Sequence, residues 1–255
     1  MTRKLVQIFT DSRGQDLEPF LANQLPRDQV TVKVHVRRGA TLEKAIEHLK
    51  READTNTDLI IIAAGICNLT HKESRGRTRT LTYTSSEENL TLIKDTLTAL
   101  SREFQNKLII ATIPPASLVK YYSHFNNTEP PSFLTDQQND LLRDTEELNQ
   151  YIITLNKAAN LQTIYLHKQC FNTSLHRKKK TSTNPGKRRR IFLEKLFTDG
   201  VHSNSTLQYK WFNRYYSAIN GWLQQLPSSD MENEGPVAWD YKRNAGADEP
   251  STSRE

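Results

Sequence analysis

The chain has 255 residues, of which 36% are hydrophobic and 25% charged, and this is enough apolar material for the core of one large domain. Two cysteines, Cys67 and Cys170, are too few for a disulfide framework or a zinc cluster, and no segment approaches the roughly 20 apolar residues of a membrane span. The net charge is +6, but one segment between His176 and Arg190 contributes +8, so the rest of the chain carries −2 and a basic nucleic-acid-binding face spread over the fold is not expected.

Five short apolar segments predict β-strands, taken here in chain order. The second alternates apolar and polar side chains, which indicates a half-buried edge strand. The third is continuously apolar, as in a central parallel strand with helices on both faces. The predicted strands are residues 5–9, 30–36, 59–64, 108–112 and 163–166.

Four segments between and after these strands place apolar residues three and four positions apart, which predicts amphipathic helices. They are residues 41–52, 85–104, 135–159 and 207–226, and we interpret the aromatic stripe of the last one as core packing. Because strands alternate with helices, the sequence predicts βαβ units, a parallel sheet and helices on both of its faces. We therefore expect an α/β fold with five parallel strands in the order 2-1-3-4-5.

The domain organisation follows from composition. Residues 1–226 form one predicted domain, and residues 168–190 a long polar, basic loop within it. Residues 227–255 are rich in Ser, Asp, Glu and Pro and hold seven acids against three bases, which predicts a disordered acidic tail.

Polar motifs follow several of the predicted strands. Ser12 and Gly39 come after the first and second strands, Asn68 comes after the third, and Asp199 and His202 precede the last helix. Because ligands of open α/β sheets bind outside the carboxyl ends of the strands, we expect these residues along one rim.

The residue types at that rim suit nucleophilic catalysis. A serine hydroxyl is a weak nucleophile that needs a histidine to take its proton, and the histidine needs a carboxylate to hold its tautomer. Ser12, His202 and Asp199 are therefore the candidate triad. The backbone N–H groups of Ser12 and Gly39, together with the side-chain amide of Asn68, are the candidate oxyanion-hole donors. Each has a structural alternative as well: a turn or N-cap for Ser12, a turn for Gly39 and a helix cap for Asn68.

These motifs resemble those of the SGNH (GDSL-type) hydrolases, over about residues 4–226. Thr10-Asp11-Ser12 matches two positions of the family's G-D-S motif, and Asp199 and His202 match its D-x-x-H motif. The resemblance implies a three-layer α/β/α, flavodoxin-like fold in which Ser12 is the nucleophile, His202 the base and Asp199 its orienting partner. The sequence is also similar in style to the esterase-like domains of some invertebrate retroelements.

The third motif departs from the family pattern G-x-N-D. Counted from Gly65, the asparagine position holds Cys67, and Asn68 occupies the aspartate position. A thiol is a weak hydrogen-bond donor, so Asn68 remains the candidate third donor and would need a local backbone shift to reach the oxyanion.

The predicted function is hydrolysis of a small-molecule or lipid carboxylic ester through an acyl-enzyme, without a metal ion or an organic cofactor. The alternative is a non-catalytic module of the same fold that binds RNA or DNA through the basic loop. The candidate triad favours ester hydrolysis, since a protein that only binds nucleic acid has no need of a triad. The atypical third motif and the basic loop favour the second.

The basic loop has three interpretations: a solvated loop, a bipartite nuclear-import signal, or a contact for phosphates. The N-terminus lacks a long apolar region and a small-residue cleavage site, so we expect a protein that is not secreted and is cytoplasmic, or nuclear if the loop is an import signal. The basic residues are Arg177, Lys178, Lys179, Lys180, Lys187, Arg188, Arg189 and Arg190.

Overall fold

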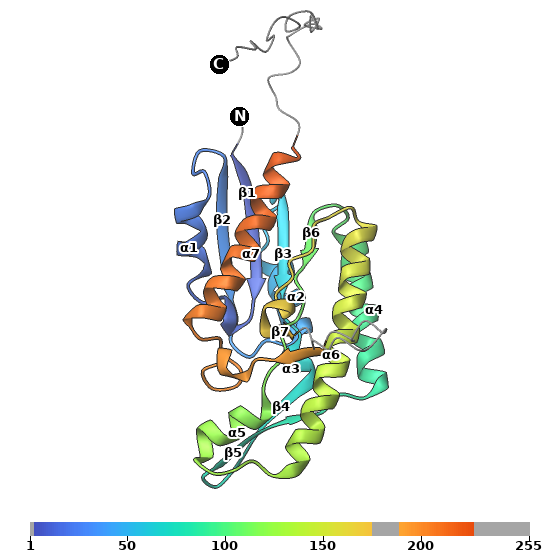
Figure 1. The fold of residues 1–255 in the computed structure, drawn as a ribbon. Helices are drawn as coiled ribbons and strands as arrows, with labels where there is room; N and C mark the ends of the chain where they lie inside the picture. The colour runs from blue at the N-terminus through green and yellow to red at the C-terminus, as the bar shows by residue number, and fades with distance from the viewer. Residues whose placement is uncertain (1–2, 175–188, 227–255) are drawn as a thin grey trace, which may run out of the picture. The chain divides into compact units, whose positions relative to one another are not determined.

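A four-stranded parallel sheet forms the centre of the computed structural model, which describes residues 3–174 and 189–226 (Figure 1). Its order is β2-β1-β3-β6, so β2 is an edge strand and β3 an inner one, as the sequence predicts. The register pairs Thr10 with Val36 and with Ala63, so the first three strands end level at one rim. The strands are β1 (Lys4–Thr10), β2 (Val30–Val36), β3 (Leu59–Ala63) and β6 (Leu108–Ile110).

The prediction of a fifth strand at 163–166 is wrong, because this segment does not join the sheet. The Thr112 N–H donates one hydrogen bond to the Ile164 carbonyl at 3.0 Å. The N–H of Leu166 then bonds to the Thr112 side-chain oxygen at 2.8 Å instead of to a backbone carbonyl. The Thr112 side chain thus replaces the backbone carbonyl that would continue a β-ladder. Pro114 and Pro115, which have no N–H to donate, follow soon after.

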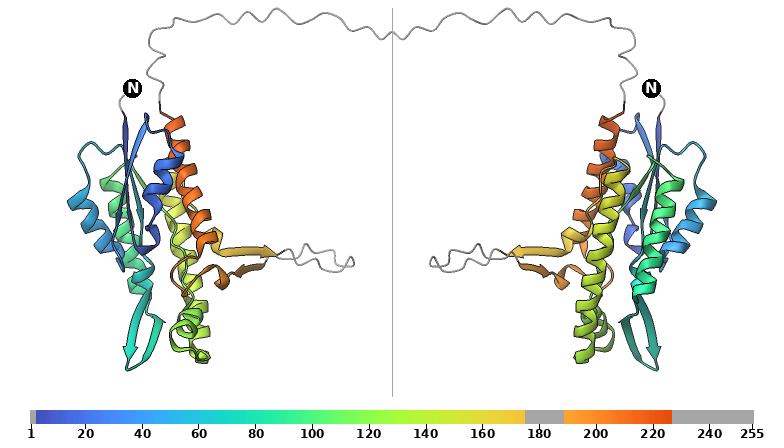
Figure 2. Two further views of the ribbon diagram at one scale, coloured as in Figure 1. Left: turned by 90° about the vertical axis from the view of Figure 1, so that its left-hand side faces the viewer. Right: turned by 90° about the vertical axis from the view of Figure 1, so that its right-hand side faces the viewer.

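Helices cover both faces of the sheet, which confirms the predicted three-layer α/β/α arrangement (Figure 2). Alternate residues of β3 supply the two cores: Ile60 and Ile62 face one side, Leu59 and Ile61 the other. The first face packs against α2 (Leu42–Glu52), α4 (Glu87–Glu103) and α6 (Ser132–Ala158), and the second against α1 (Leu17–Gln24) and α7 (Ser205–Gln224).

The four predicted helices correspond to α2, α4, α6 and α7, and three of them begin at a side-chain cap. Thr41, Ser86 and Asn204 each accept a hydrogen bond from the backbone N–H three residues later. Such a cap satisfies one of the unpaired N–H groups of a helix start. In α7, Trp211 and Tyr215 are buried and Trp222 is partly buried, so its aromatic stripe is core packing as predicted.

A small lobe extends beyond the carboxyl ends of the strands (Figure 1). It holds the hairpin of β4 (Thr70–Arg75) and β5 (Thr78–Tyr83) and the helix α5 (Leu118–Asn126), which packs on β5. The hairpin follows α3 (Ile66–Leu69) directly and turns at Gly76, whose φ of 61° suits glycine in a two-residue loop. None of these elements is predicted from the sequence.

The two ends of the predicted basic loop form regular secondary structure. The 3-10 helix η2 (His167–Cys170) leads into β7 (Phe171–Ser174), which pairs with β8 (Arg189–Phe192). Of the eight candidate cations, Arg190 forms an ion pair with Glu146 at 2.8 Å, and its guanidinium lies 4.4 Å from the centre of the Phe171 ring. The candidates from Arg177 to Arg188 and the predicted tail, residues 227–255, lie outside the described residues. Within residues 3–174 and 189–226 no helix combines the length and the apolar character needed to cross a membrane.

Candidate active site

Ser12 lies in a tight turn at the end of β1. The 3-10 helix η1 (Ser12–Gly14) begins immediately after the strand, and the Asp11 side chain caps it by accepting a hydrogen bond from the Arg13 N–H at 2.9 Å. Gly14 lets the chain fold back closely, because a Cβ there would lie 2.1 Å from the Thr10 methyl group. The sequence Asp-Ser-Arg-Gly thus fixes the backbone on which the serine stands.

A second compact turn, before α7, presents the aspartate and the histidine. One Asp199 carboxylate oxygen accepts hydrogen bonds from the N–H groups of Val201 and His202, at 2.9 and 2.7 Å. Gly200 has a φ of 91°, and a Cβ on it would lie 2.4 Å from the Ser117 carbonyl oxygen. Only glycine fits this close approach of the loop to α5.

The two turns meet so that Ser12, His202 and Asp199 form a hydrogen-bonded series. Ser12 Oγ is 3.1 Å from His202 Nε2, and His202 Nδ1 is 2.7 Å from Asp199 Oδ2. A carboxylate beside Nδ1 favours the tautomer that carries its proton there, which leaves Nε2 free to accept the serine proton. The His202 side chain is 43% exposed, so a substrate can reach it from solvent.

The electrostatics of Asp199 suit a permanent anion. Burial raises its pKa, but the hydrogen bonds from the His202 side chain and from the N–H groups of His202 and Val201 outweigh burial. The pKa of Asp199 is therefore held well below its usual range, and the carboxylate stays ionised at neutral pH.

Gly39 lies in the turn that follows β2. The Arg37 N–H donates to the Thr10 carbonyl at 2.9 Å, and the Ala40 N–H closes the turn onto the Arg37 carbonyl at 3.2 Å. Gly39 has a φ of 65°, and no atom lies within 4 Å of the place where a Cβ would be. In the described ranges, neither the Ser12 N–H nor the Gly39 N–H has a hydrogen-bond partner, so both remain available to a ligand.

Asn68 is used by the start of α2. Its Oδ1 accepts a hydrogen bond from the Leu42 N–H at 2.8 Å, and its Nδ2 lies 3.0 and 2.9 Å from the two carboxylate oxygens of Glu43. This is the helix-cap alternative that the sequence leaves open, and no hydrogen bond between Ser12 and Asn68 is found in the described part of the chain. The neighbouring Cys67 is half-buried, and burial raises the pKa of its thiol, with the nearby Arg13 acting in the opposite direction.

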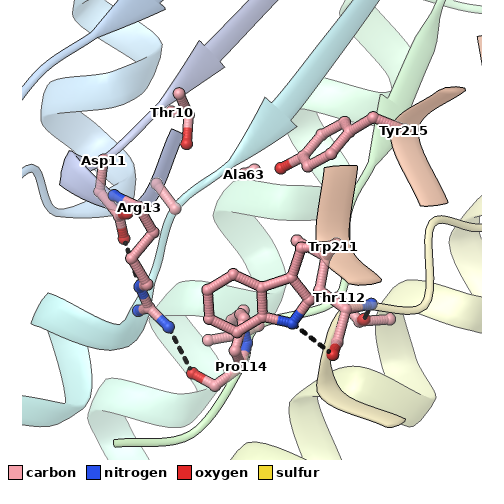
Figure 3. A pocket seen from close by; sticks show the side chains of 11 residues that line it. Thr10, Asp11, Arg13, Ala63, Thr112, Pro114, Trp211 and Tyr215 are labelled. Carbon is pink, nitrogen blue, oxygen red and sulfur yellow. Dashed lines mark hydrogen bonds and ion pairs between the residues drawn. The ribbon is translucent and has the colours of Figure 1, made fainter. Parts of the chain in front are cut away.

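Arg13 is a feature of the site that sequence reasoning missed. Its side chain is 7% exposed and bridges two loops: Nε lies 3.3 Å from Asp11 Oδ2, and Nη1 donates to the Pro114 carbonyl at 2.9 Å (Figure 3). The only sequence signal is its position directly after the serine. The ion pair lies within the serine turn, and the hydrogen bond to Pro114 ties that turn to the loop that follows β6.

A small cavity of about 20 Å³ lies behind this turn. It is large enough for one water molecule and too small for a substrate. The residues that line it include Thr10, Arg13, Thr112, Trp211 and Tyr215 (Figure 3). Across residues 3–174 and 189–226, no group of three His, Cys, Asp or Glu side chains is placed to hold a metal ion.

Comparison with known proteins supports the fold and not a sequence family. No family model and no curated protein sequence matches the chain. Among solved structures, the acetyl xylan esterase AlAXEase is similar over 84% of this chain and 99% of its own, with a TM-score of 0.53 and 19% identity. The carbohydrate acetylesterase Est24 from Sinorhizobium meliloti is similar over 86% and 100%, with a TM-score of 0.52 and 12% identity.

An aryl esterase from M. smegmatis is similar over 86% of this chain and 99% of its own, with a TM-score of 0.51 and 13% identity. A further match is described as a GDSL-like lipase, with a TM-score of 0.51. At these identities the likeness concerns the fold alone. The chain has the fold of the SGNH hydrolases.

Proposed function

We propose that the protein is a serine hydrolase that cleaves carboxylic esters through an acyl-enzyme on Ser12. The observation that carries the proposal is the hydrogen-bonded series from Ser12 Oγ through His202 to Asp199, at 3.1 and 2.7 Å. Three residues from two distant parts of the chain meet in the order that activation of a serine requires.

The proposed reaction has two halves. Ser12 Oγ attacks the ester carbonyl while His202 Nε2 takes its proton, and the tetrahedral intermediate then collapses as His202 gives that proton to the departing alcohol. A water molecule next attacks the acyl-enzyme, again losing a proton to His202, and the acid leaves as Ser12 recovers its hydrogen. Asp199 orients the imidazole and stabilises its protonated form throughout.

The N–H groups of Ser12 and Gly39 are the proposed oxyanion donors, since both are unpaired in the described residues. Asn68, the third candidate, would first have to give up its hydrogen bonds to Leu42 and Glu43. One oxyanion donor is typically worth about 2.7–4 kcal/mol of barrier, so we expect a slower enzyme than one with three donors in place.

The proposed substrate is a small-molecule or lipid ester. The acetylesterase names of two structural neighbours favour esters with a short acyl group. No step of this reaction requires a metal ion or a cofactor.

The test is hydrolysis of 4-nitrophenyl acetate and butyrate by the full chain, beside Ser12→Ala. Ser217→Ala is the matched control, because Ser217 is an exposed serine on α7 whose side chain, among the described residues, bonds only to the Asn213 carbonyl. The proposal expects turnover that survives in the control and disappears in Ser12→Ala. Equal rates in all three proteins would refute it.

The alternative, a nucleic-acid-binding module, rests on the charge of residues 177–190 and carries no geometric support, because residues 177–188 lie outside the described residues. Both this role and nuclear import remain predictions from the sequence. The assembled series at Ser12 favours the hydrolase.

A further inference from the structure

The small lobe beyond the sheet concentrates positive charge. We define the basic lobe as residues 70–83 and 117–127, which contain five Lys or Arg residues and one acid, a net charge of +4. Residues 1–69, 84–116, 128–176 and 191–226 together contain 19 Lys or Arg against 21 Asp or Glu, a net charge of −2. Outside residues 177–190, the positive charge of the domain is therefore concentrated in this lobe.

The basic lobe adjoins the proposed triad through direct contacts. The Lys72 ammonium on β4 lies 5.8 Å from the centre of the Tyr121 ring on α5. A Cβ on Gly200 would lie 2.6 Å from the Tyr121 backbone nitrogen, and the Ser117 N–H donates to the Gly200 carbonyl at 2.7 Å. Lys72 thus stands over a residue that packs on the loop carrying Asp199 and His202.

The acid–base surroundings of Tyr121 agree with this placement. Burial raises the pKa of Tyr121, the Asp199 carboxylate raises it further, and the Arg79 guanidinium acts in the opposite direction. The pKa of Tyr121 therefore depends on both Asp199 of the proposed triad and Arg79 of the hairpin. Arg79 itself lies 5.3 Å from the centre of the Phe125 ring, so a second cation–π contact holds it on α5.

These cations are not neutralised inside the domain. In the described part of the chain, the only ion pair within the basic lobe joins Arg75 to Glu73 at 3.7 Å. Lys72 and Arg79 are exposed and have no carboxylate partner among the described residues. Two fixed cations without counter-charges at the edge of a reaction site attract anions and lower the free energy of a bound one.

We propose that the substrate is an anionic ester whose negative group, a carboxylate, sulfonate or phosphate, binds beside Lys72 and Tyr121 while its ester carbonyl faces Ser12. Lys72 holds the anion, and Arg79 with the rest of the basic lobe raises its rate of arrival. The proposal rests on the hydrolase function proposed above and specifies its substrate class.

The experiment compares two matched acetate esters, 4-acetoxybenzenesulfonate, which is an anion, and 4-acetoxybenzenesulfonamide, which is neutral. The measured quantity is the ratio of their kcat/KM values, so differences that affect both esters cancel. We expect Lys72→Gln to lower this ratio by about twofold to fivefold, the effect of one partly exposed ion pair, and Lys72→Gln with Arg79→Gln to lower it further. The ratio in the wild type should fall as salt rises, because exposed charges are screened.

Two controls separate this site from the general charge of the chain. Lys72→Arg keeps the positive charge and should keep the ratio. Lys107→Gln removes an exposed lysine at the opposite, amino-terminal edge of the sheet, where its Nζ meets only the Thr57 carbonyl, and should also keep it. An unchanged ratio in both Lys72→Gln and the double variant would overturn the proposal.

A binding measurement distinguishes failure of this inference from failure of the proposed function. If the wild type and Ser12→Ala hydrolyse both esters at one rate, the hydrolase is refuted, and the anion site is then tested by titrating 4-hydroxybenzenesulfonate into the full chain. Binding that weakens about twofold to fivefold in Lys72→Gln supports the site. Absence of binding, or equal binding in both proteins, overturns it.

Discussion

The two halves of the rim at the carboxyl ends of the strands use their polar side chains in opposite ways. On one half, Ser12 and His202 come from separate turns, and the hydrogen bond between their side chains neither caps a helix nor closes a turn. On the other half, the amide of Asn68 is consumed in holding the start of α2. The first pair suits the proposed proton transfer, whereas the hydrogen bonds of the asparagine hold the start of α2.

The difference shows how neighbouring positions can keep or lose a catalytic use. A helix-start hydrogen bond from a side chain is worth about 1 kcal/mol of stability, and an amide whose oxygen and nitrogen are both engaged in this way cannot donate to a substrate at the same time. A serine and a histidine that bond to one another remain available, because the hydrogen bond between them is the path along which the serine proton would move when an ester approaches.

The largest predicted effect concerns the first half of the rim. His202→Gln removes the proposed acceptor of the serine proton, so we expect kcat/KM for 4-nitrophenyl acetate to fall at least about 10³-fold. His71→Gln is the matched control, since His71 is an exposed histidine of β4. A comparable loss in the control, or a loss below tenfold in His202→Gln, would remove the distinction between the two halves.

The second prediction concerns the stability that Asp199 supplies and its dependence on pH. Because its pKa is lowered in the folded state from an ordinary value of about 3.9, the ionised carboxylate stabilises the fold above pH 4, and this contribution is lost as the pH falls through the folded-state pKa. Asp199→Asn should therefore lower the free energy of unfolding at pH 7 by about 1.5–3 kcal/mol, with a smaller loss at pH 3.

Denaturant titrations at the two pH values measure this difference. Asp95→Asn, at an exposed position of α4, is the control and should change stability little at either pH. A destabilisation by Asp199→Asn that is as large at pH 3 as at pH 7 would contradict the assigned origin of the shift.

The smallest predicted effect concerns the second half of the rim. Asn68→Ala removes the acceptor of the Leu42 N–H at the start of α2, so we expect the free energy of unfolding to fall by about 1 kcal/mol, with kcat/KM for 4-nitrophenyl acetate reduced less than tenfold. Asn213→Ala, which removes only a bond to the Tyr209 carbonyl within α7, is the matched control. A loss of 10²-fold or more in activity with unchanged stability would mean that Asn68 is an oxyanion donor after all.

The sequence predicts those parts of the fold whose signals are local. The apolar runs of β1, β2 and β3 and the periodicity of α2, α4, α6 and α7 identify the three layers. The prediction of a fifth strand is wrong because the Thr112 side-chain oxygen, and not a backbone carbonyl, accepts the hydrogen bond from the Leu166 N–H. No pattern of apolar residues reveals such a replacement. The β4–β5 hairpin is missed because its strands are mostly polar and turn at Gly-Arg instead of a typical hairpin pair.

The candidate site likewise contains parts that the sequence shows and parts that it does not. Asp199 and His202 lie three residues apart, and Asp11, Ser12 and Gly14 form one short turn, so both fragments are visible in the sequence. The capping role of Asn68 depends on the Leu42 N–H, 26 residues away, and the link from Lys72 to the triad depends on α5. Such contacts arise only when distant segments pack.

Whether Ser12 is an activated nucleophile can be measured by covalent labelling with diethyl 4-nitrophenyl phosphate followed by peptide mass spectrometry. An activated serine displaces 4-nitrophenol and keeps the diethylphosphoryl group. We expect one equivalent of label on the peptide that contains Ser12, strongly reduced labelling in His202→Gln, and none at that peptide in Ser12→Ala. An unlabelled Ser12 peptide, or the same labelling rate in His202→Gln as in the wild type, would contradict it.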